Sequence, residues 1–210
     1  MAILKRTGSV LFVGAAIAGV IGLSAAPALA ATWTVKPGGT VAATSGKTTL
    51  TDTNTGVSLS CASSKGAATL KSGSGLSGTG IGSITSLAFN SCTGPAGLKF
   101  TVTTSHFPWS LNAVSFNSTS GVTTGTLTGI HATLTGPGCS AVVDGTSATA
   151  DNGKVSATYT NSTGVLKTLT TGGNLHTYSV SGCFGLIHSG DSATFSGTYA
   201  VSPKQTITSP

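Results

Sequence analysis

The 210-residue chain contains no glutamate, and only 7% of its residues are charged. Its acidic side chains belong to four aspartates, Asp52, Asp144, Asp151 and Asp191. Glycosidase-type acid and base catalysis requires two carboxyl groups that flank the bond to be cleaved. Asp144 and Asp151 are the one carboxylate pair close in sequence, and Asp151 belongs to a turn sequence with Asn152 and Gly153. We therefore predict that the protein has no catalytic residues and is not an enzyme.

Arginine is also scarce, and Arg6 is its one representative. Beyond residue 30 the positive charge comes from eight lysines, scattered singly, against four aspartates, which gives a net charge of 8 − 4 = +4. Nucleic-acid-binding proteins usually gather Lys and Arg on one face, with aromatic side chains between them. The scattered lysines therefore predict that nucleic acid is not a partner.

Motifs for cofactors and metals are weak or missing. Gly73–Gly78 has the G-x-G-x-x-G spacing of a dinucleotide-binding loop, but no acidic residue lies between Lys71 and Asp144 to bind a ribose, so we predict a flexible surface loop. Residues 144–152 lack the dense oxygen ligands and the terminal Glu of a calcium loop. The cysteines form no C-x-x-C pair for zinc. We predict no cofactor and no bound metal.

The N-terminus has the pattern of a secretory signal. Lys5 and Arg6 precede an apolar run over Val10–Leu23, and Ala28–Ala30 supplies the small residues of a cleavage site. The apolar run covers roughly 14 residues, whereas a membrane-spanning helix needs about 20. We predict that residues 1–30 are a cleaved signal peptide and that the mature protein is secreted, either extracellular or at the cell surface.

Four cysteines follow this signal, and an even number in an exported chain favours disulfide bonds. They are Cys61, Cys92, Cys139 and Cys183. Of three possible pairings we favour Cys61–Cys92 and Cys139–Cys183, because each pair brackets one half of the chain with similar surroundings. The closed loops are long (92 − 61 = 31 and 183 − 139 = 44 residues), so chain entropy predicts about 3 to 4 kcal/mol of stabilisation per bridge.

Residues 31–201 are predicted to form a single all-β domain. Short runs such as Leu98–Val102 and Val155–Tyr159 alternate in polarity and are divided by Gly, Asn and Asp turn sequences. About ten to thirteen short strands fit the spacing, and an antiparallel β-sandwich or a closed β-barrel would bury them. The surroundings of Cys92 and Cys183 are weakly similar, which indicates two similar halves. Residues 202–210 are predicted to be a polar C-terminal tail.

One aromatic segment is a candidate ligand surface. His106, Phe107 and Trp109 surround Pro108, which interrupts strand pairing, so their rings could lie exposed and bind a sugar, a lipid or a protein. Alternatively, Phe107 and Trp109 fill one end of the barrel or sandwich. We favour this second interpretation, because a core rich in small residues needs its few large side chains.

The remaining histidines form no motif in the sequence. His131 and His176 are isolated, as is His106, and His176 shares a strand face with Tyr178, which predicts a half-buried imidazole. His188–Asp191 contains the residue types of a catalytic triad, but neighbours in one turn do not converge as a triad requires. We predict a Gly-Asp turn there.

Four segments of the chain resemble those of uncharacterised secreted, β-rich proteins of actinobacteria. The segments are Ser74–Thr85, Phe107–Asn112, Thr133–Cys139 and Phe195–Tyr199. The resemblance implies an exported, disulfide-bonded β protein, and it carries over no catalytic residues.

Three functions are compatible with these features. The leading hypothesis is a non-enzymatic secreted or cell-surface β-domain with a structural or binding role, whose partner would be the cell wall, a glycan or an envelope lipid. The first alternative is a cell-envelope β-barrel or oligomeric pore, whose strands would carry an outward apolar band. The second alternative is a secreted hydrolase that uses Asp or His from distant strands.

Overall fold

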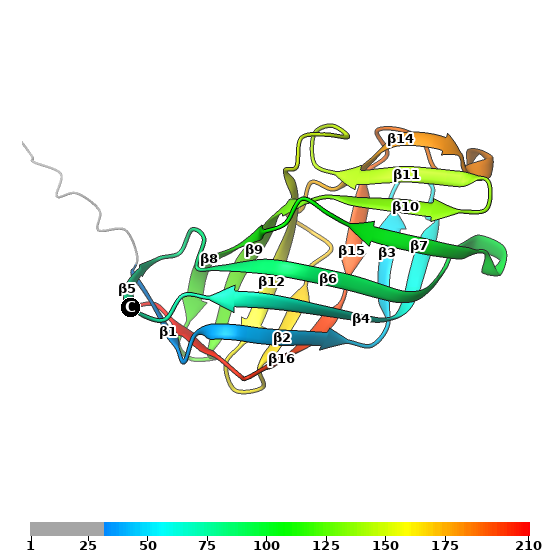
Figure 1. Ribbon diagram of the computed structural model, residues 1–210. Helices are drawn as coiled ribbons and strands as arrows, with labels where there is room; N and C mark the ends of the chain where they lie inside the picture. The colour runs from blue at the N-terminus through cyan, green and yellow to red at the C-terminus, as the bar shows by residue number, and fades with distance from the viewer. Residues whose placement is uncertain (1–31) are drawn as a thin grey trace, which may run out of the picture.

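The computed structural model describes residues 32–210, so the predicted signal peptide lies outside the described residues. This part of the chain forms seventeen strands and two short 3-10 helices (Figure 1). Eight of the strands close an antiparallel barrel, which confirms the all-β prediction and decides for the barrel over the sandwich. The barrel strands are β2 (Gly39–Ser45), β4 (Ser58–Leu70), β6 (Gly82–Thr93), β8 (Trp109–Asn117), β9 (Val122–Ile130), β12 (Gly153–Thr160), β13 (Val165–Thr168) and β16 (Thr198–Ser202).

Neighbouring strands of the barrel follow the order β4, β6, β8, β9, β12, β13, β16 and β2, and β2 pairs back with β4. Barrel closure removes the unpaired edges that an open sheet of this size would expose. The strand count exceeds the predicted ten to thirteen because several strands have three to five residues, too few to show alternation. None of the helices in the described part of the chain is long and apolar enough to cross a membrane.

The strands β4 and β6 continue beyond the barrel and carry an extension (Figure 1). On the β6 side the order is β7, β10, β11 and β14, and on the β4 side β3 is followed by β15. An isolated bridge between His176 and Ser192 joins the two sides. The extension comprises β3 (Thr48–Asp52), β7 (Lys99–Thr104), β10 (Ala132–Gly136), β11 (Cys139–Asp144), β14 (His176–Gly182), β15 (Ala193–Ser196) and the 3-10 helices Pro95–Gly97 and Cys183–Gly185.

A separate three-stranded sheet contains β1 (Thr32–Lys36), β5 (Gly73–Ser77) and β17 (Thr206–Thr208). Two predictions are corrected here. The glycine run over 73–78 is not a flexible loop, because its backbone pairs with β1 around the buried Trp33. Residues 202–210 are not a free polar tail, because β17 also pairs with β1 and buries Ile207. Strand pairing and a few buried side chains hold two segments whose composition alone suggested loops.

Two clusters of buried side chains form the core. The first lies around Trp109, Leu134 and the Cys61–Cys92 bridge, and the second gathers Trp33, Val35 and Ile207 of the small sheet against the barrel. Both predicted disulfides are confirmed. Cys61 and Cys92 are directly paired residues of β4 and β6, and Cys139 of β11 is linked to Cys183. The first bridge therefore joins two strands that already lie side by side, and the second joins β11 to the 3-10 helix that directly follows its neighbour β14.

Candidate functional site

The interior contains an apolar cavity of about 190 Å³, lined by side chains of both core clusters. Ile84, Leu87 and Phe89 of β6 line it together with Leu127 of β9. These four side chains remain half-buried although they face the interior. Close-packed cores leave few voids larger than one water molecule. The half-buried inner wall therefore marks unfilled apolar space.

The small sheet closes one end of this cavity. Ile207 and Gln205 line it, and the Gln205 side chain is 1% exposed. The Tyr159 hydroxyl donates to the Gln205 carbonyl (2.9 Å) and accepts from the Gln205 N–H (2.8 Å). Burial raises the pKa of Tyr159 above its usual range, so this hydroxyl stays neutral at the cavity wall. The C-terminal residues thus belong to the wall of the cavity.

The predicted aromatic segment is divided between the core and the surface. The Phe107 and Trp109 rings stack with centroids 4.6 Å apart, and Trp109 is 2% exposed and lines the cavity. The Trp109 indole N–H donates to the Ser105 carbonyl (2.9 Å). Phe107 is half-buried against the same core cluster, and His106 is exposed. Of the three residues, His106 is the one that is exposed at the surface.

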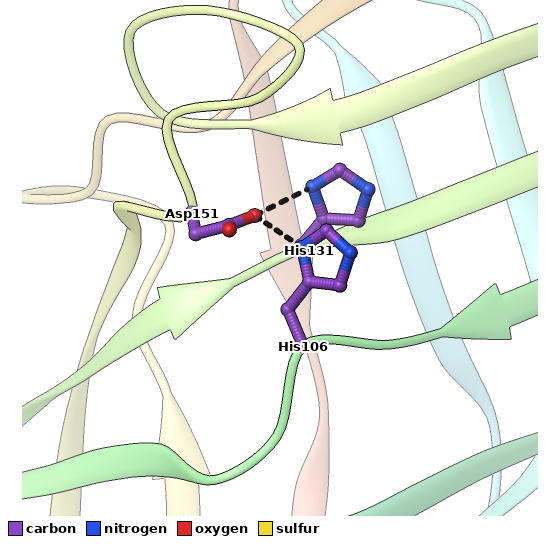
Figure 2. Close-up of side chains that lie close together, drawn as sticks. All are labelled: His106, His131 and Asp151. Atoms are coloured by element: carbon purple, nitrogen blue, oxygen red, sulfur yellow. Dashed lines mark hydrogen bonds and ion pairs between the residues drawn. The ribbon is translucent and has the colours of Figure 1, made fainter.

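His106 instead belongs to a cluster with His131 and Asp151, shown in Figure 2. His106 lies between β7 and β8, His131 between β9 and β10, and Asp151 between β11 and β12. The Nδ1 atoms of His106 and His131 lie 2.5 and 3.2 Å from Asp151 Oδ1. The two imidazole rings stack with centroids 4.3 Å apart. The prediction that these histidines are isolated is therefore wrong.

Asp144, the last residue of β11, holds this arrangement together. Its carboxylate is fully buried and accepts hydrogen bonds from the His131 Nδ1–H (2.9 Å) and from four backbone N–H groups. Those groups belong to Gly145, Asp151, Asn152 and Gly153. Burial alone would raise the pKa of Asp144, but the hydrogen bonds from His131 and the backbone outweigh it and lower that pKa. Asp144 thus folds the loop that presents Asp151.

Two residues of the cluster adopt the left-handed backbone conformation. His106 has φ 57° and Asp151 has φ 51°. A non-glycine residue in this region costs of order 1 to 3 kcal/mol, least for Asp and Asn, and such residues concentrate at functional sites. The sequence held no local signal for the cluster, because its members are 131 − 106 = 25 and 151 − 131 = 20 residues apart.

Two other sequence predictions concern histidines elsewhere. His176 is half-buried, as predicted, and its Nδ1 lies 2.8 Å from the Asn174 carbonyl oxygen. His188–Asp191 forms a turn, which confirms that prediction, since the Asp191 carboxylate accepts from the His188 backbone N–H (2.7 Å) and the Asp191 N–H donates to the His188 carbonyl. His176, His188 and Asp191 do not belong to the cluster of His106, His131 and Asp151 in Figure 2.

Fold and site define the class of this protein: a disulfide-linked, antiparallel β-barrel domain with an apolar interior. Residues 4–209 match the model of a family described as alkane oxidation protein activator PraA/PraB-like, and the chain belongs to that family. No match was found among curated proteins or solved structures. The family description points to an activator, which indicates an accessory role.

Proposed function

We propose that the protein is a non-enzymatic accessory domain that acts outside the cytoplasm and binds an aliphatic hydrocarbon chain inside its barrel. The observation that carries this proposal is the apolar cavity, whose half-buried aliphatic and aromatic walls would gain burial from a bound chain. The family description supplies the ligand class, because it links the family to alkane oxidation.

The size of the cavity sets the length of the chain. An apolar cavity of about 150 Å³ holds the six carbons of benzene. In proportion, a cavity of about 190 Å³ accommodates roughly seven or eight carbons. Each buried methylene contributes about 0.8 kcal/mol, which corresponds to roughly a fourfold gain in affinity. Affinity should therefore rise with chain length until the cavity is filled.

Location and lack of catalysis rest on separate features. Two disulfides suit an oxidising compartment, and the N-terminal sequence suits export. In the described part of the chain, the hydrogen bonds of the His106, His131 and Asp151 side chains involve no Ser, Thr or Cys side chain. This arrangement offers no activated nucleophile of the triad type, which favours the binding function over the hydrolase.

The outer surface bears on the pore hypothesis. Within residues 32–210 the large hydrophobic side chains that are clearly exposed are Val114, Phe184 and Leu186. A barrel wall in contact with lipid would need a continuous outward apolar band. The polar outer surface therefore favours an accessory domain, and a cell wall, a glycan or an envelope lipid stays the proposed class of partner.

Binding of n-alkanols to the mature protein tests the proposal, because alkanols dissolve better than alkanes and present the same chain. Trp109 lines the cavity, so its fluorescence should report occupancy. Across roughly four to twelve carbons we expect affinity to rise about fourfold per methylene and to level off near eight. Affinity that is independent of chain length would contradict an internal site.

A cavity-filling variant supplies the second arm of the test. Leu127→Trp places a larger side chain on the inner wall and should weaken octanol binding at least tenfold. Thr69→Trp is the matched control, since Thr69 is exposed on β4 and the same residue type is introduced outside the barrel. Equal binding by both variants, with thermal unfolding like that of the wild type, would place the alkyl chain elsewhere.

A further inference from the structure

We propose that His106, His131 and Asp151 bind a divalent transition-metal ion of the Zn²⁺ class. The three side chains come from three separate strand connections, and one donor atom of each lies within 4.8 Å of the others. Figure 2 shows both Nδ1 atoms directed at the same carboxylate. This site is independent of the barrel cavity and of the function proposed for it.

The spacing of the donor atoms suits a small ion. Zinc binds imidazole nitrogen at about 2.0–2.1 Å, so neighbouring donors of a tetrahedral ion lie about 3.3 Å apart. His131 Nδ1 and Asp151 Oδ1 are separated by 3.2 Å, close to this value. His106 Nδ1 lies 2.5 Å from the same oxygen and would have to move outward by less than 1 Å. His106 is exposed, so the surrounding structure leaves room for that movement.

The charge balance around the cluster also favours a cation. The His131 Nδ1 faces two carboxylates, Asp144 Oδ2 at 2.9 Å and Asp151 Oδ1 at 3.2 Å. A single N–H proton serves two acceptors poorly, and the His106 Nδ1 is directed at the Asp151 oxygen as well. A divalent ion bound to both Nδ1 atoms would take the place of the two Nδ1–H protons, each imidazole then carrying its proton on Nε2, and would offset the negative charges of both carboxylates.

The ligand positions are built into the backbone. Asp144 accepts the backbone N–H groups of Asp151 and of its two following residues, which fixes the Asp151 carboxylate relative to β11. His131 has a side chain 9% exposed and forms the inner side of the site, whereas the His106 and Asp151 side chains are 49% and 44% exposed. The His131 side of the site is therefore held rigidly, whereas the side formed by His106 and Asp151 is open to an ion from solvent.

The donor set selects the class of metal. Two imidazoles with a carboxylate suit Zn²⁺, Co²⁺, Ni²⁺ and Cu²⁺, whereas Ca²⁺ takes six to eight oxygen ligands. Three protein donors would leave the remaining coordination positions to water. The expected behaviour is one equivalent of Zn²⁺ or Co²⁺ per chain, with no comparable binding of Ca²⁺.

Calorimetric titration of the EDTA-treated, dialysed mature protein with Zn²⁺ tests this site, and Co²⁺ absorption reports the ligand geometry. Asn is the substitution of choice at all three positions, because it tolerates the left-handed conformation of His106 and Asp151 and keeps a donor near that of His131. Each of His106→Asn, His131→Asn and Asp151→Asn should weaken Zn²⁺ binding at least tenfold. His188→Asn, at an exposed histidine beside a different aspartate, should leave it unchanged.

Two results would overturn the proposal. The first is a wild-type protein that binds neither Zn²⁺ nor Co²⁺ at millimolar concentration. The second is Zn²⁺ binding that survives in His106→Asn and Asp151→Asn but is lost in His188→Asn, which would place the ion in the His188–Asp191 turn. If His131→Asn fails to fold, the two exposed positions decide the question alone, since neither side chain is part of the core.

Discussion

Replacing the buried carboxylate of Asp144 with an amide should destabilise the fold by about 3 to 5 kcal/mol. In the wild type Oδ1 accepts three backbone N–H groups, and Oδ2 accepts the Asp151 N–H and the His131 Nδ1–H. Asn retains one acceptor oxygen and presents an NH₂ group in place of the other. The more favourable orientation of the Asn side chain places its oxygen at the position of Oδ1, where three N–H groups donate. The two hydrogen bonds to Oδ2 are then lost.

The magnitude follows from the two hydrogen bonds lost on that side. Hydrogen bonds to a charged group contribute about 1.5 to 3 kcal/mol each, and removal of one partner leaves the other buried and unpaired. Two such losses sum to about 3 to 6 kcal/mol, and removal of one partner of a buried charged pair costs about 3 to 5 kcal/mol, so we expect a loss of about 3 to 5 kcal/mol. For a domain of this size each kcal/mol lowers Tm by about 2–4 °C, so Tm should fall by about 6 to 20 °C.

Calorimetry and urea unfolding in the presence of EDTA measure this effect, and Asp151→Asn is the matched control. Asp151 lies in the same loop with its side chain 44% exposed, so its substitution should cost less than about 1 kcal/mol. An Asp144→Asn variant within 1 kcal/mol of the wild type would refute the reasoning that this carboxylate folds the loop.

The pH dependence of stability, compared between the wild type and Asp144→Asn, tests the direction of the Asp144 pKa shift. The fold lowers the pKa of Asp144, so the ionised form is favoured by folding. Its stabilisation is therefore present above the unfolded pKa of about 3.9 and is lost as the pH falls through the folded pKa. The difference in Tm between the wild type and Asp144→Asn should be largest near neutral pH and should shrink under acid conditions.

Three further variants test the fold. Replacing Cys61 and Cys92 together with Ala should remove about 3 to 4 kcal/mol of stability in urea unfolding, and unchanged stability would mean that the loop closure contributes nothing. Ile207→Ala should cost about 2–5 kcal/mol if the C-terminal strand belongs to the core, measured by thermal unfolding, whereas a free tail would show no change. Gly125→Ala should lower Tm because its Cβ would overlap a carbonyl of β8, while Gly46→Ala, in open space, should have little effect.

Much of the fold was predictable because its causes are local. Period-two alternation requires only neighbouring residues, so the strands around Val155–Tyr159 were visible in the sequence. The cysteine pairing was predictable because each pair brackets one half of the chain. The sequence did not distinguish the glycine run over 73–78 from a loop, because the strand with which it pairs, β1, lies remote in sequence.

The candidate site was predictable only in part, because most of its contacts join residues remote in sequence. Trp109 and Phe107 were expected in the core because a chain rich in Gly, Ser and Thr has few large side chains to bury. His106, His131 and Asp151 gave no signal, since each lies in a different connection. Those connections meet because β7, β10 and β11 are neighbours in the sheet, as are β8, β9 and β12. Asp144 gave none either, because its importance lies in hydrogen bonds to a loop that the sequence does not distinguish from other turns.

The sequence by itself determined an all-β chain with paired cysteines and little catalytic chemistry, because composition and alternation are properties of near neighbours. Tertiary structure alone decided that the strands close a barrel, that its interior is left partly unfilled, and that two histidines meet one aspartate. Those outcomes depend on pairings between strands far apart in the chain, such as β16 with β2, in which Tyr199 is paired with Ser45, and on the pairing of β10 with β7. Long-range pairing, rather than local preference, created both the cavity and the histidine cluster.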